Sequence, residues 1–306
     1  MKKNNAHTIL SPQQETVIRQ ILPIAGIATC GASGELPVHP RTQTLLIGPS
    51  GSGKSFMARE IARRLNLPLL LINVSSWVVL SAKNEPWTSS TICDWLESLG
   101  NGGGILALDE IDKLQGDTDW KSYIRLEVHD LLDGVIPHAA RLPHQPVEDP
   151  WGSTPNAESD RLTRTMLAAR LRNKVFVIGC GAFQTAWTSI SRRIGFDSES
   201  PDPEHPSRQQ ILESISPEIR QRFRDDACWL EPMRFDEFQA VSSRIAEALP
   251  DPKMRRAWNR LAGAAIERAL AGGLGMRVFE ELMLSVLIDI HAGIAPDSRE
   301  LLLPDI

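Results

Sequence analysis

The chain has 306 residues, of which 42% are hydrophobic and 23% are charged, the usual mixture of a folded globular protein. This length allows one large domain, or one large and one small domain. The net charge of −5 gives no overall basic field that would hold nucleic acid or an anionic membrane, although a local basic patch is compatible with it.

The first half of the chain alternates apolar runs with amphipathic stretches. Residues 11–22 predict a helix with Ser11 as its N-cap, and residues 26–43, rich in Gly, Pro and Thr, read as a loop. Buried strands are predicted at residues 45–47, 67–74 and 104–110. Helices are predicted at residues 55–65, 89–99 and 120–132.

The second half begins with residues 136–160, which read as an irregular, exposed insertion. A helix at 161–172 and a fourth strand at 174–181 follow, and then a polar, proline-rich loop at 198–208. Beyond Pro232 no further strand is predicted, and three helices are expected at residues 235–249, 254–271 and 276–291.

Strands that are nearly continuous apolar runs and alternate with helices imply an α/β fold, with a parallel sheet covered on both faces. The change to helices alone near residue 230 predicts two domains. We expect a large α/β domain over residues 1–232, which begins with a helix and loop over 1–43, and a small α-helical domain over 233–306.

A phosphate-binding loop is the most specific motif. The pattern G-x-x-x-x-G-K-[ST] is matched in full by Gly48, Pro49, Ser50, Gly51, Ser52, Gly53, Lys54 and Ser55. A strand precedes this turn and a helix follows it, as the mechanism demands: backbone N–H groups and the helix N-terminus bind phosphate oxygens, and the lysine adds a cation. The serine can ligate Mg²⁺. We therefore predict ATP and Mg²⁺ as cofactors, with nucleotide contacts that extend to Phe56.

Two carboxylates, Asp109 and Glu110, follow the third predicted strand at its carboxyl end, where ligands of such sheets bind. Asp109 is placed to hold the Mg²⁺ shell together with Ser55, and Glu110 to orient and deprotonate an attacking water. The alternative is an acidic first turn of a helix, which is common because it suits the helix dipole. An intact phosphate loop upstream favours the catalytic interpretation.

Other site types are not indicated. The four cysteines form no CxxC pair, which argues against a zinc module or a disulfide framework and favours a cytoplasmic protein. The first fifteen residues have no apolar core and predict no signal peptide, and no apolar run approaches the length of a membrane span. The seven histidines show no metal-ligand spacing and are expected mostly on the surface.

These motifs together resemble the AAA+ ATPases, and DEIDK most resembles the ClpX/HslU unfoldase branch, here without its N-terminal zinc-binding module. The likeness covers roughly residues 40–290 and keeps the family's order. It runs from GPSGSGKS and LALDEIDKL through WKSYIRLEVHDLLDG (120–134), VFVIGCGAFQ (175–184), RRIGF (192–196) and SPEIRQRF (216–223) to GGLGMRVFEEL (272–282). The IGF tripeptide at 194–196 resembles a peptidase-docking loop, or it is a glycine-capped helix end.

The resemblance implies further residue roles. Arg222 would be the arginine finger that reaches the nucleotide of a neighbouring subunit, with Arg220 and Arg224 as alternatives, or else a surface arginine. Arg277 would be the sensor-2 arginine, or a solvated arginine at a helix start. The sensor-1 position would fall near Cys180, where the family's usual polar residue is missing.

Trp87 falls where the unfoldases carry an aromatic pore loop that grips polypeptide, and an aromatic ring offers large, sequence-tolerant contact area. The pattern is broken here, because Thr88 replaces the aliphatic residue and Ser89 the glycine. A packed or interface tryptophan is an equal alternative, and Trp77 is a rival for the gripping role.

The resemblance thus implies an ATP-hydrolysing, homo-oligomeric ring, a hexamer in this branch, that unfolds or remodels a protein substrate. A nucleotide-dependent switch or assembly scaffold, which recruits protein partners or DNA with slow turnover, is the alternative. A monomeric small-molecule kinase, which needs no arginine finger, is a third possibility. No membrane partner is indicated, and the net charge gives no sign of nucleic acid.

Overall fold

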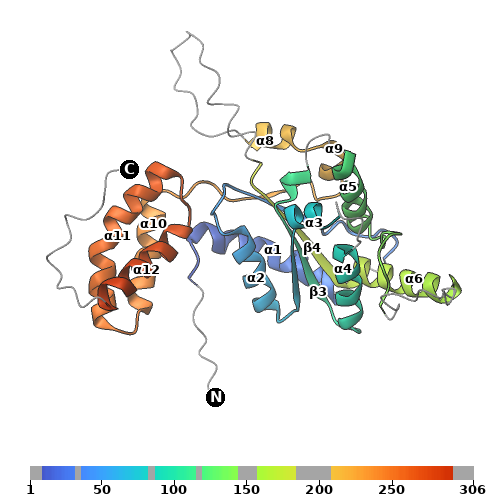
Figure 1. Cartoon of the computed structure of the whole chain (residues 1–306), viewed down its shortest axis with the longest axis horizontal. Helices are drawn as coiled ribbons and strands as arrows, with labels where there is room; N and C mark the ends of the chain where they lie inside the picture. Colours follow the sequence, from blue (N-terminus) through green and yellow to red (C-terminus); the bar gives the residue numbers. More distant parts are fainter. Residues whose placement is uncertain are drawn as a thin grey trace, which may run out of the picture. The chain divides into compact units, whose positions relative to one another are not determined.

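The computed structural model describes residues 9–31, 36–81, 87–114, 119–143, 157–183 and 208–291. Contacts divide the chain into two compact units. The first unit contains residues 17–48 and 54–229, and the second contains residues 1–16, 49–53 and 230–306. Figure 1 labels the α-helices of both units and strands β3 and β4.

A parallel sheet forms the centre of the first unit. Within the described residues it has five strands in the order β2-β3-β4-β1-β5. The strands are β1 (Thr44–Ile47), β2 (Leu69–Asn73), β3 (Gly104–Asp109), β4 (Val175–Gly181) and β5 (Cys228–Trp229). All four pairings are parallel, so the carboxyl ends of the strands lie along one edge. The predicted α/β fold class is therefore confirmed.

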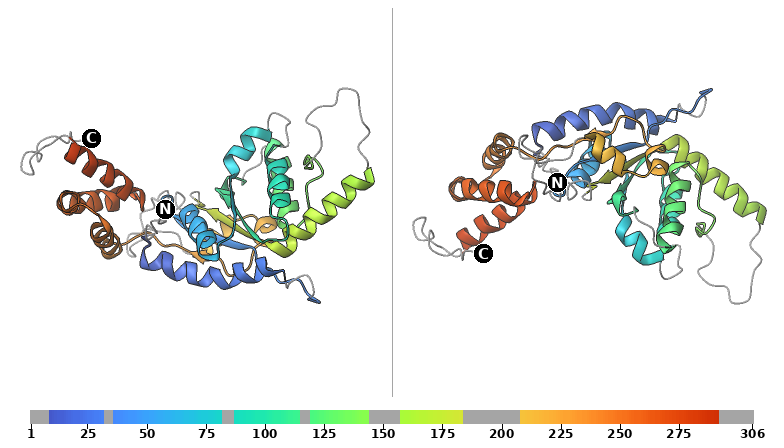
Figure 2. Two further views of the ribbon diagram at one scale, coloured as in Figure 1. Left: turned by 90° about the horizontal axis from the view of Figure 1, so that it is seen from below. Right: turned by 90° about the horizontal axis from the view of Figure 1, so that it is seen from above.

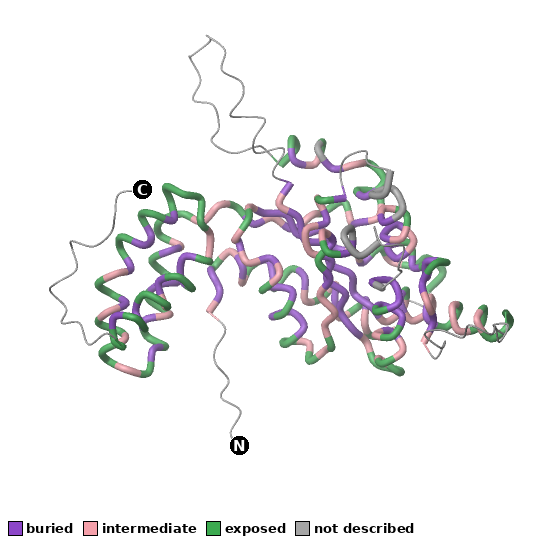
Figure 3. Tube along the Cα trace, viewed as in Figure 1, coloured by how far each residue is buried: buried purple, intermediate pink, exposed green. Residues whose placement is uncertain are grey.

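Helices cover both faces of this sheet. Alternate side chains of the strands, such as Leu106 and Leu108, pack into one core with α3 (Val74–Ser81), α4 (Trp87–Ser98), α5 (Asp119–Leu132) and α6 (Ala157–Lys174). Helix α1 (Pro12–Cys30) lies across the sheet from α3, α4 and α5 in both views of Figure 2. Helix α2 (Lys54–Leu65) contacts β2, β3 and β4. Figure 3 shows the strands as mostly buried stretches, while exposure alternates along the helices.

Helix α1 is longer than the sequence predicts, and the expected loop at 26–43 is wrong as far as Cys30. The helix continues through Pro23 because its apolar stripe continues: Ile21, Ala25 and Ala28 are all buried. Burial of this stripe outweighs the cost of a proline inside a helix.

The predicted strand at 67–74 ends one residue early and is followed by a helix that the sequence analysis missed. Asn73 is the last residue of β2, and its side-chain oxygen accepts a hydrogen bond from Ser76 N at 3.2 Å. This is the geometry by which asparagine caps a helix, so α3 begins at Val74 although its first residue is apolar. The short elements β5, α8 (Arg208–Ser214) and α9 (Pro217–Arg220) were also missed.

The expected exposed insertion at 136–160 is wrong at both ends. Ile136, Ala140 and Leu142 are buried, and α6 already begins at Ala157. Arg164 of α6 secures this stretch by donating to the carbonyl oxygens of Pro137, His138 and Ala140 at 2.8, 3.0 and 2.9 Å. Residues 144–156 lie outside the described part, as do the IGF tripeptide and all of the predicted loop at 198–208 except Arg208.

Three helices form the core of the second unit, at the predicted places: α10 (Phe235–Ala248), α11 (Pro252–Gly272) and α12 (Arg277–His291). Trp258 stacks on Phe279, with ring centroids 6.0 Å apart, and Phe238 lies 5.9 Å from the same ring. Asp251 caps α11 by accepting from Lys253 N at 2.8 Å. A domain boundary between residues 232 and 233 stays a prediction.

Candidate functional site

The glycine-rich turn between β1 and α2 has the backbone shape that its sequence predicts. Gly51 and Gly53 take positive φ angles of 76° and 87°, which L-residues with a side chain adopt at a cost. Ser52 N donates to Pro49 O at 3.3 Å and closes a tight turn. Where β1 ends, Gly48 N donates to Gly181 O of β4 at 3.3 Å, which ties the start of the turn to the sheet.

The end of this turn brings a cation and a hydroxyl to the carboxyl edge of the sheet. Lys54 is 9% exposed, and its Nζ donates to Gly48 O at 2.8 Å. Ser55 Oγ donates to Asp109 Oδ2 at the end of β3. The two residues predicted to hold Mg²⁺ are thus in contact although 54 positions separate them. A hydroxyl beside a carboxylate is an oxygen donor set that suits Mg²⁺, which binds protein through one or two such groups and takes its other ligands from phosphate and water.

Glu110 is held in an uncommon backbone conformation directly after β3. Its φ is 58°, a region that non-glycine residues seldom occupy and that clusters at functional sites. Its N–H donates to Asp109 Oδ1 at 3.1 Å, and its Oε2 accepts from Ser75 Oγ at 2.5 Å. Ser75 is a contact of Glu110 that sequence reasoning missed, because it lies in the unexpected helix α3.

Cys180 occupies the predicted sensor-1 position, opposite Asp109 in the register of β3 and β4. Burial raises the pKa of its thiol to about 12, with the charge of Asp109 adding to this shift and that of Lys54 opposing it. The thiol stays protonated at neutral pH and so lacks the thiolate needed of a nucleophile.

Within the second unit, the start of α12 contacts the middle of the turn. Met276 N, just before α12, donates to Gly51 O at 2.9 Å. A Cβ on Gly275 would lie 2.3 Å from that same oxygen, so only glycine permits this approach. Arg277 is the next residue, the first of α12, and it is exposed. Of the glycines that precede Arg277, Gly275 thus has a specific partner in the turn.

Phe56 and Arg222 are two further residues that the sequence predicts at the site. Phe56 is 40% exposed on the first turn of α2. Arg222 follows α9 and forms an ion pair with Asp133 of the same chain, with Nη2 2.8 Å from Oδ2. Its Nη1 also donates to Glu218 O at 2.7 Å. Whether Arg222 reaches a neighbouring subunit stays a prediction.

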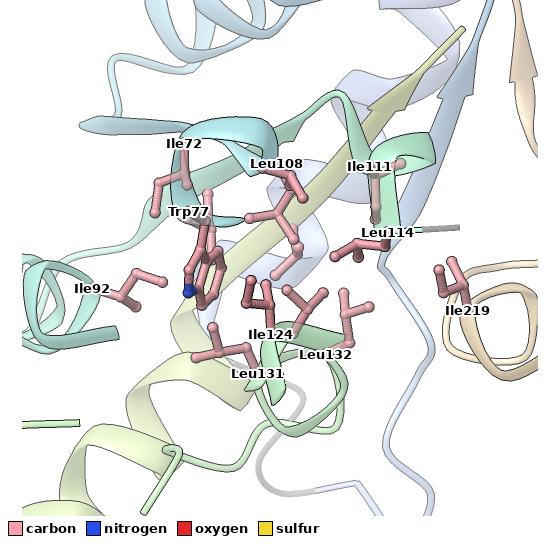
Figure 4. Packing of buried hydrophobic residues seen from close by; sticks show 14 of the residues in the cluster. Ile72, Trp77, Ile92, Leu108, Ile111, Leu114, Ile124, Leu131, Leu132 and Ile219 are labelled. Carbon is pink, nitrogen blue, oxygen red and sulfur yellow. The ribbon is translucent and has the colours of Figure 1, made fainter. Parts of the chain in front are cut away.

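Trp87 is the first residue of α4, and its side chain lies outside what the structure describes. Its rival Trp77 is 1% exposed and packs among apolar side chains such as Ile72, Ile92 and Leu108, as Figure 4 shows. The indole Nε1 of Trp77 donates to Glu127 Oε2 at 2.9 Å. Trp77 is therefore a core residue and is not available to grip a polypeptide.

Comparison with known families adds one finding. Residues 44–134, from β1 to just beyond α5, match the model of the AAA family, "ATPase family associated with various cellular activities". The match contains the phosphate loop, Asp109 and Glu110, and it supports an AAA+ ATPase. Together with the parallel sheet, it is consistent with an AAA+ P-loop domain followed by a C-terminal helical region. Among the helices that the structure describes, none is long and apolar enough to cross a membrane.

Proposed function

We propose that this chain binds and hydrolyses Mg²⁺-ATP as a ring-forming AAA+ ATPase of ClpX-like type, and that it unfolds or remodels a protein substrate. The observation that carries the proposal is the contact between Ser55 and Asp109, at the end of a glycine turn that also presents Lys54. Lys54 and Ser55 follow β1, and Asp109 ends β3. Their side chains are a cation, a hydroxyl and a carboxylate, which together suit a metal-bound polyphosphate.

Each residue has a distinct task in this proposal. The N–H groups of the turn and Lys54 bind the phosphate oxygens, and Ser55 and Asp109 hold the metal. Bound Mg²⁺ neutralises charge on the phosphates. Glu110 orients the attacking water and accepts its proton, which requires the carboxylate to leave its hydrogen bond with Ser75.

The ring and the polypeptide substrate are the finer part of the proposal. AAA proteins typically oligomerise into rings, and a ring would let Arg222 act on the nucleotide of the adjoining copy. Arg277 follows the residue whose N–H binds Gly51 O, a position suited to relating nucleotide state to the helical unit. Trp87 would contact the polypeptide.

A nucleotide-dependent switch or assembly scaffold is the second candidate, because Ser75 holds Glu110 by a short hydrogen bond. A carboxylate held by this hydrogen bond is less free to turn toward an attacking water, which favours slow turnover. Such a protein would recruit a protein partner or DNA in its ATP-bound form.

The nucleotide proposal is tested by the binding and hydrolysis of Mg²⁺-ATP. We expect Lys54→Ala to weaken ATP binding at least tenfold, and Asp109→Asn to remove most of the Mg²⁺-dependent hydrolysis. The exposed Lys253 of α11 supplies a matched control, since Lys253→Ala removes a similar charge away from the turn. Unchanged ATP binding by Lys54→Ala would refute the assignment.

The motor and the switch differ in what stimulates hydrolysis. The ATPase rate is measured with unfolded protein, with duplex DNA and with neither, for the wild type and Trp87→Ala. Stimulation by unfolded protein that requires Trp87 supports the motor. Stimulation by DNA, or by neither, supports the switch. Sedimentation with a non-hydrolysable ATP analogue tests the ring, because a persistent monomer contradicts it.

A further inference from the structure

Helix α1 begins with a reciprocal pair of hydrogen bonds. Gln14 N donates to Ser11 Oγ at 3.2 Å, and Ser11 N donates to Gln14 Oε1 at 2.9 Å. This S-x-x-Q arrangement is a capping box, which satisfies two N–H groups at the helix start. Both side chains are 1% exposed, so neither can exchange these bonds for water. The oxygen of the Gln14 amide is therefore engaged within its own helix.

The nitrogen of the same amide reaches the phosphate loop. Gln14 Nε2 donates to Ser52 O at 2.8 Å, between residues 38 positions apart, and Ser52 itself is 5% exposed. The two ends of one buried amide thus have separate partners, the oxygen in α1 and the nitrogen in the loop. A side-chain amide can accept at its oxygen and donate at its nitrogen in this way.

The bond to Ser52 O fixes the direction of a phosphate-binding group. The C=O of residue 52 and the N–H of residue 53 belong to one planar trans peptide and point in opposite directions. An anchor on Ser52 O therefore holds the Gly53 N–H facing away from Gln14. A Cβ on Gly53 would lie 2.5 Å from Gln14 Nε2, which shows how closely the loop packs on the amide.

We propose that Gln14 is a positioning residue for nucleotide binding, which holds the Ser52–Gly53 peptide so that its N–H faces the phosphates. This inference rests on the proposed ATP-binding function. Gln14 touches the loop and not the reacting atoms, so its loss weakens phosphate binding without removing a catalytic group. A role limited to capping α1 is the competing explanation.

Two substitutions separate these roles. Gln14→Glu keeps an oxygen for Ser11 N, since glutamate serves equally in a capping box, but it faces Ser52 O with a second oxygen. Gln14→Met has similar length and loses both bonds. If Gln14 anchors the loop, both variants raise the KM for Mg²⁺-ATP about tenfold, the effect of one ordinary hydrogen bond, and kcat stays within about twofold. Both variants lower the melting temperature of the nucleotide-free protein, Gln14→Met by losing the capping bond and Gln14→Glu by burying a carboxylate against a carbonyl oxygen, so KM is the measurement that separates the roles.

Gln20 provides the matched control, because it lies on the same helix and is exposed. Gln20→Glu adds the same charge and Gln20→Met the same apolar side chain, and neither should change KM. Should Gln14→Met not fold, Gln14→Asn takes its place, because it keeps an uncharged amide but is one methylene shorter and so reaches Ser52 O poorly.

The outcomes are distinct. A raised KM in Gln14→Met alone, together with a lower melting temperature, overturns the inference in favour of simple capping. A raised KM in Gln14→Glu alone overturns it in favour of charge repulsion. If the wild type does not bind ATP, or Lys54→Ala binds it normally, the proposed function fails and the inference fails with it. If KM is normal in both Gln14 variants while Lys54→Ala binds ATP poorly, the inference is overturned and the proposed function stands.

Discussion

Arg222 and Asp133 form an ion pair within one chain, in which Arg222 Nε and Nη2 both donate to Asp133 Oδ2, at 3.0 and 2.8 Å. The arginine side chain is 24% exposed and the carboxylate 49% exposed, so solvent weakens their attraction. A partly solvated pair of this kind can be exchanged for a more highly charged partner, such as a triphosphate, at little cost. The pair is therefore compatible with the proposed finger in a neighbouring subunit.

Mixed rings test whether Arg222 acts between subunits. Arg222→Ala should lower kcat about a thousandfold while leaving ATP binding intact, and Glu110→Gln should lower kcat by removing the base. A mixture of the two inactive variants should recover part of the activity, because the Glu110→Gln copy lends its Arg222 to the intact site of its neighbour. Arg161→Ala, an exposed arginine of α6, is the control. The assignment would be contradicted if mixing restored no activity, or if Arg220→Ala or Arg224→Ala lowered kcat as much as Arg222→Ala does.

Removal of the Ser75 hydroxyl should speed basal hydrolysis. Ser75→Ala frees Glu110 Oε2 from its 2.5 Å hydrogen bond, so the carboxylate can turn toward the attacking water without first breaking that contact. We expect kcat to rise a few-fold without a change in the affinity for ATP. Ser76→Ala, on the next and exposed residue of the same helix, should leave the rate unchanged. A rate that falls in Ser75→Ala would mean that the serine helps Glu110 instead of restraining it.

Alanine substitutions at two glycines of the second unit should have opposite effects on the protein. Gly275→Ala places a Cβ 2.3 Å from Gly51 O, so the loop must shift, and ATP affinity should fall. Gly263 lies inside α11 with nothing within 4 Å of the place that a Cβ would take, so Gly263→Ala should stabilise the protein by up to about 1 kcal/mol through helix propensity. Isothermal titration with Mg²⁺-ATP and thermal unfolding measure the two effects. Equal ATP affinities for both variants would show that the approach of Gly275 to the loop is not needed.

Acid should destabilise the protein through His129. This side chain is 9% exposed and is the exception among the described histidines, since His39, His138 and His291 are exposed as predicted. Burial lowers the pKa of His129. Arg222 and Arg125 lower the pKa further, while Asp133 and Glu218 raise it by less than the total lowering. The unfolded chain then binds a proton near pH 6.5 that the folded protein does not, so the free energy of unfolding falls as the pH drops below that value.

Denaturant unfolding at pH 7.5 and pH 5.5 measures this effect in the wild type and in His129→Gln. The variant should lose less stability between the two values, because its side chain does not titrate. An equal loss in both proteins would assign the acid sensitivity to other groups.

The sequence predicts the sheet well because buried parallel strands need long apolar runs, and GILALD has few other interpretations. It predicts the Ser55–Asp109 contact because the motif and the strand end each specify a position at the same edge of the sheet. The predicted end of α1 comes too early because Pro23 and Gly26 are residues that usually break helices, and only the fold shows that the buried stripe beyond them prevails.

Contacts set by tertiary packing could not be predicted. Gln14 and Ser52 are 38 positions apart, and nothing in SPQQ shows which glutamine faces the loop. Ser75 was missed because the apolar run that predicts β2 extends to Val74 and the two serines after it carry no helix signal of their own. The Asn73 cap starts α3 at this point. The burial of residues 136–142 depends on Arg164, a long side chain whose three carbonyl partners have no sequence signature.

The two carbonyls at the back of the glycine turn, those of Gly51 and Ser52, are both taken by donors from elsewhere in the protein, Met276 N and Gln14 Nε2. A phosphate loop held by these two hydrogen bonds is preorganised, so it loses little conformational entropy when a nucleotide binds. Association should accordingly proceed in one fast step, without a slow isomerisation after the encounter, and differences between nucleotides should show themselves in how quickly they leave.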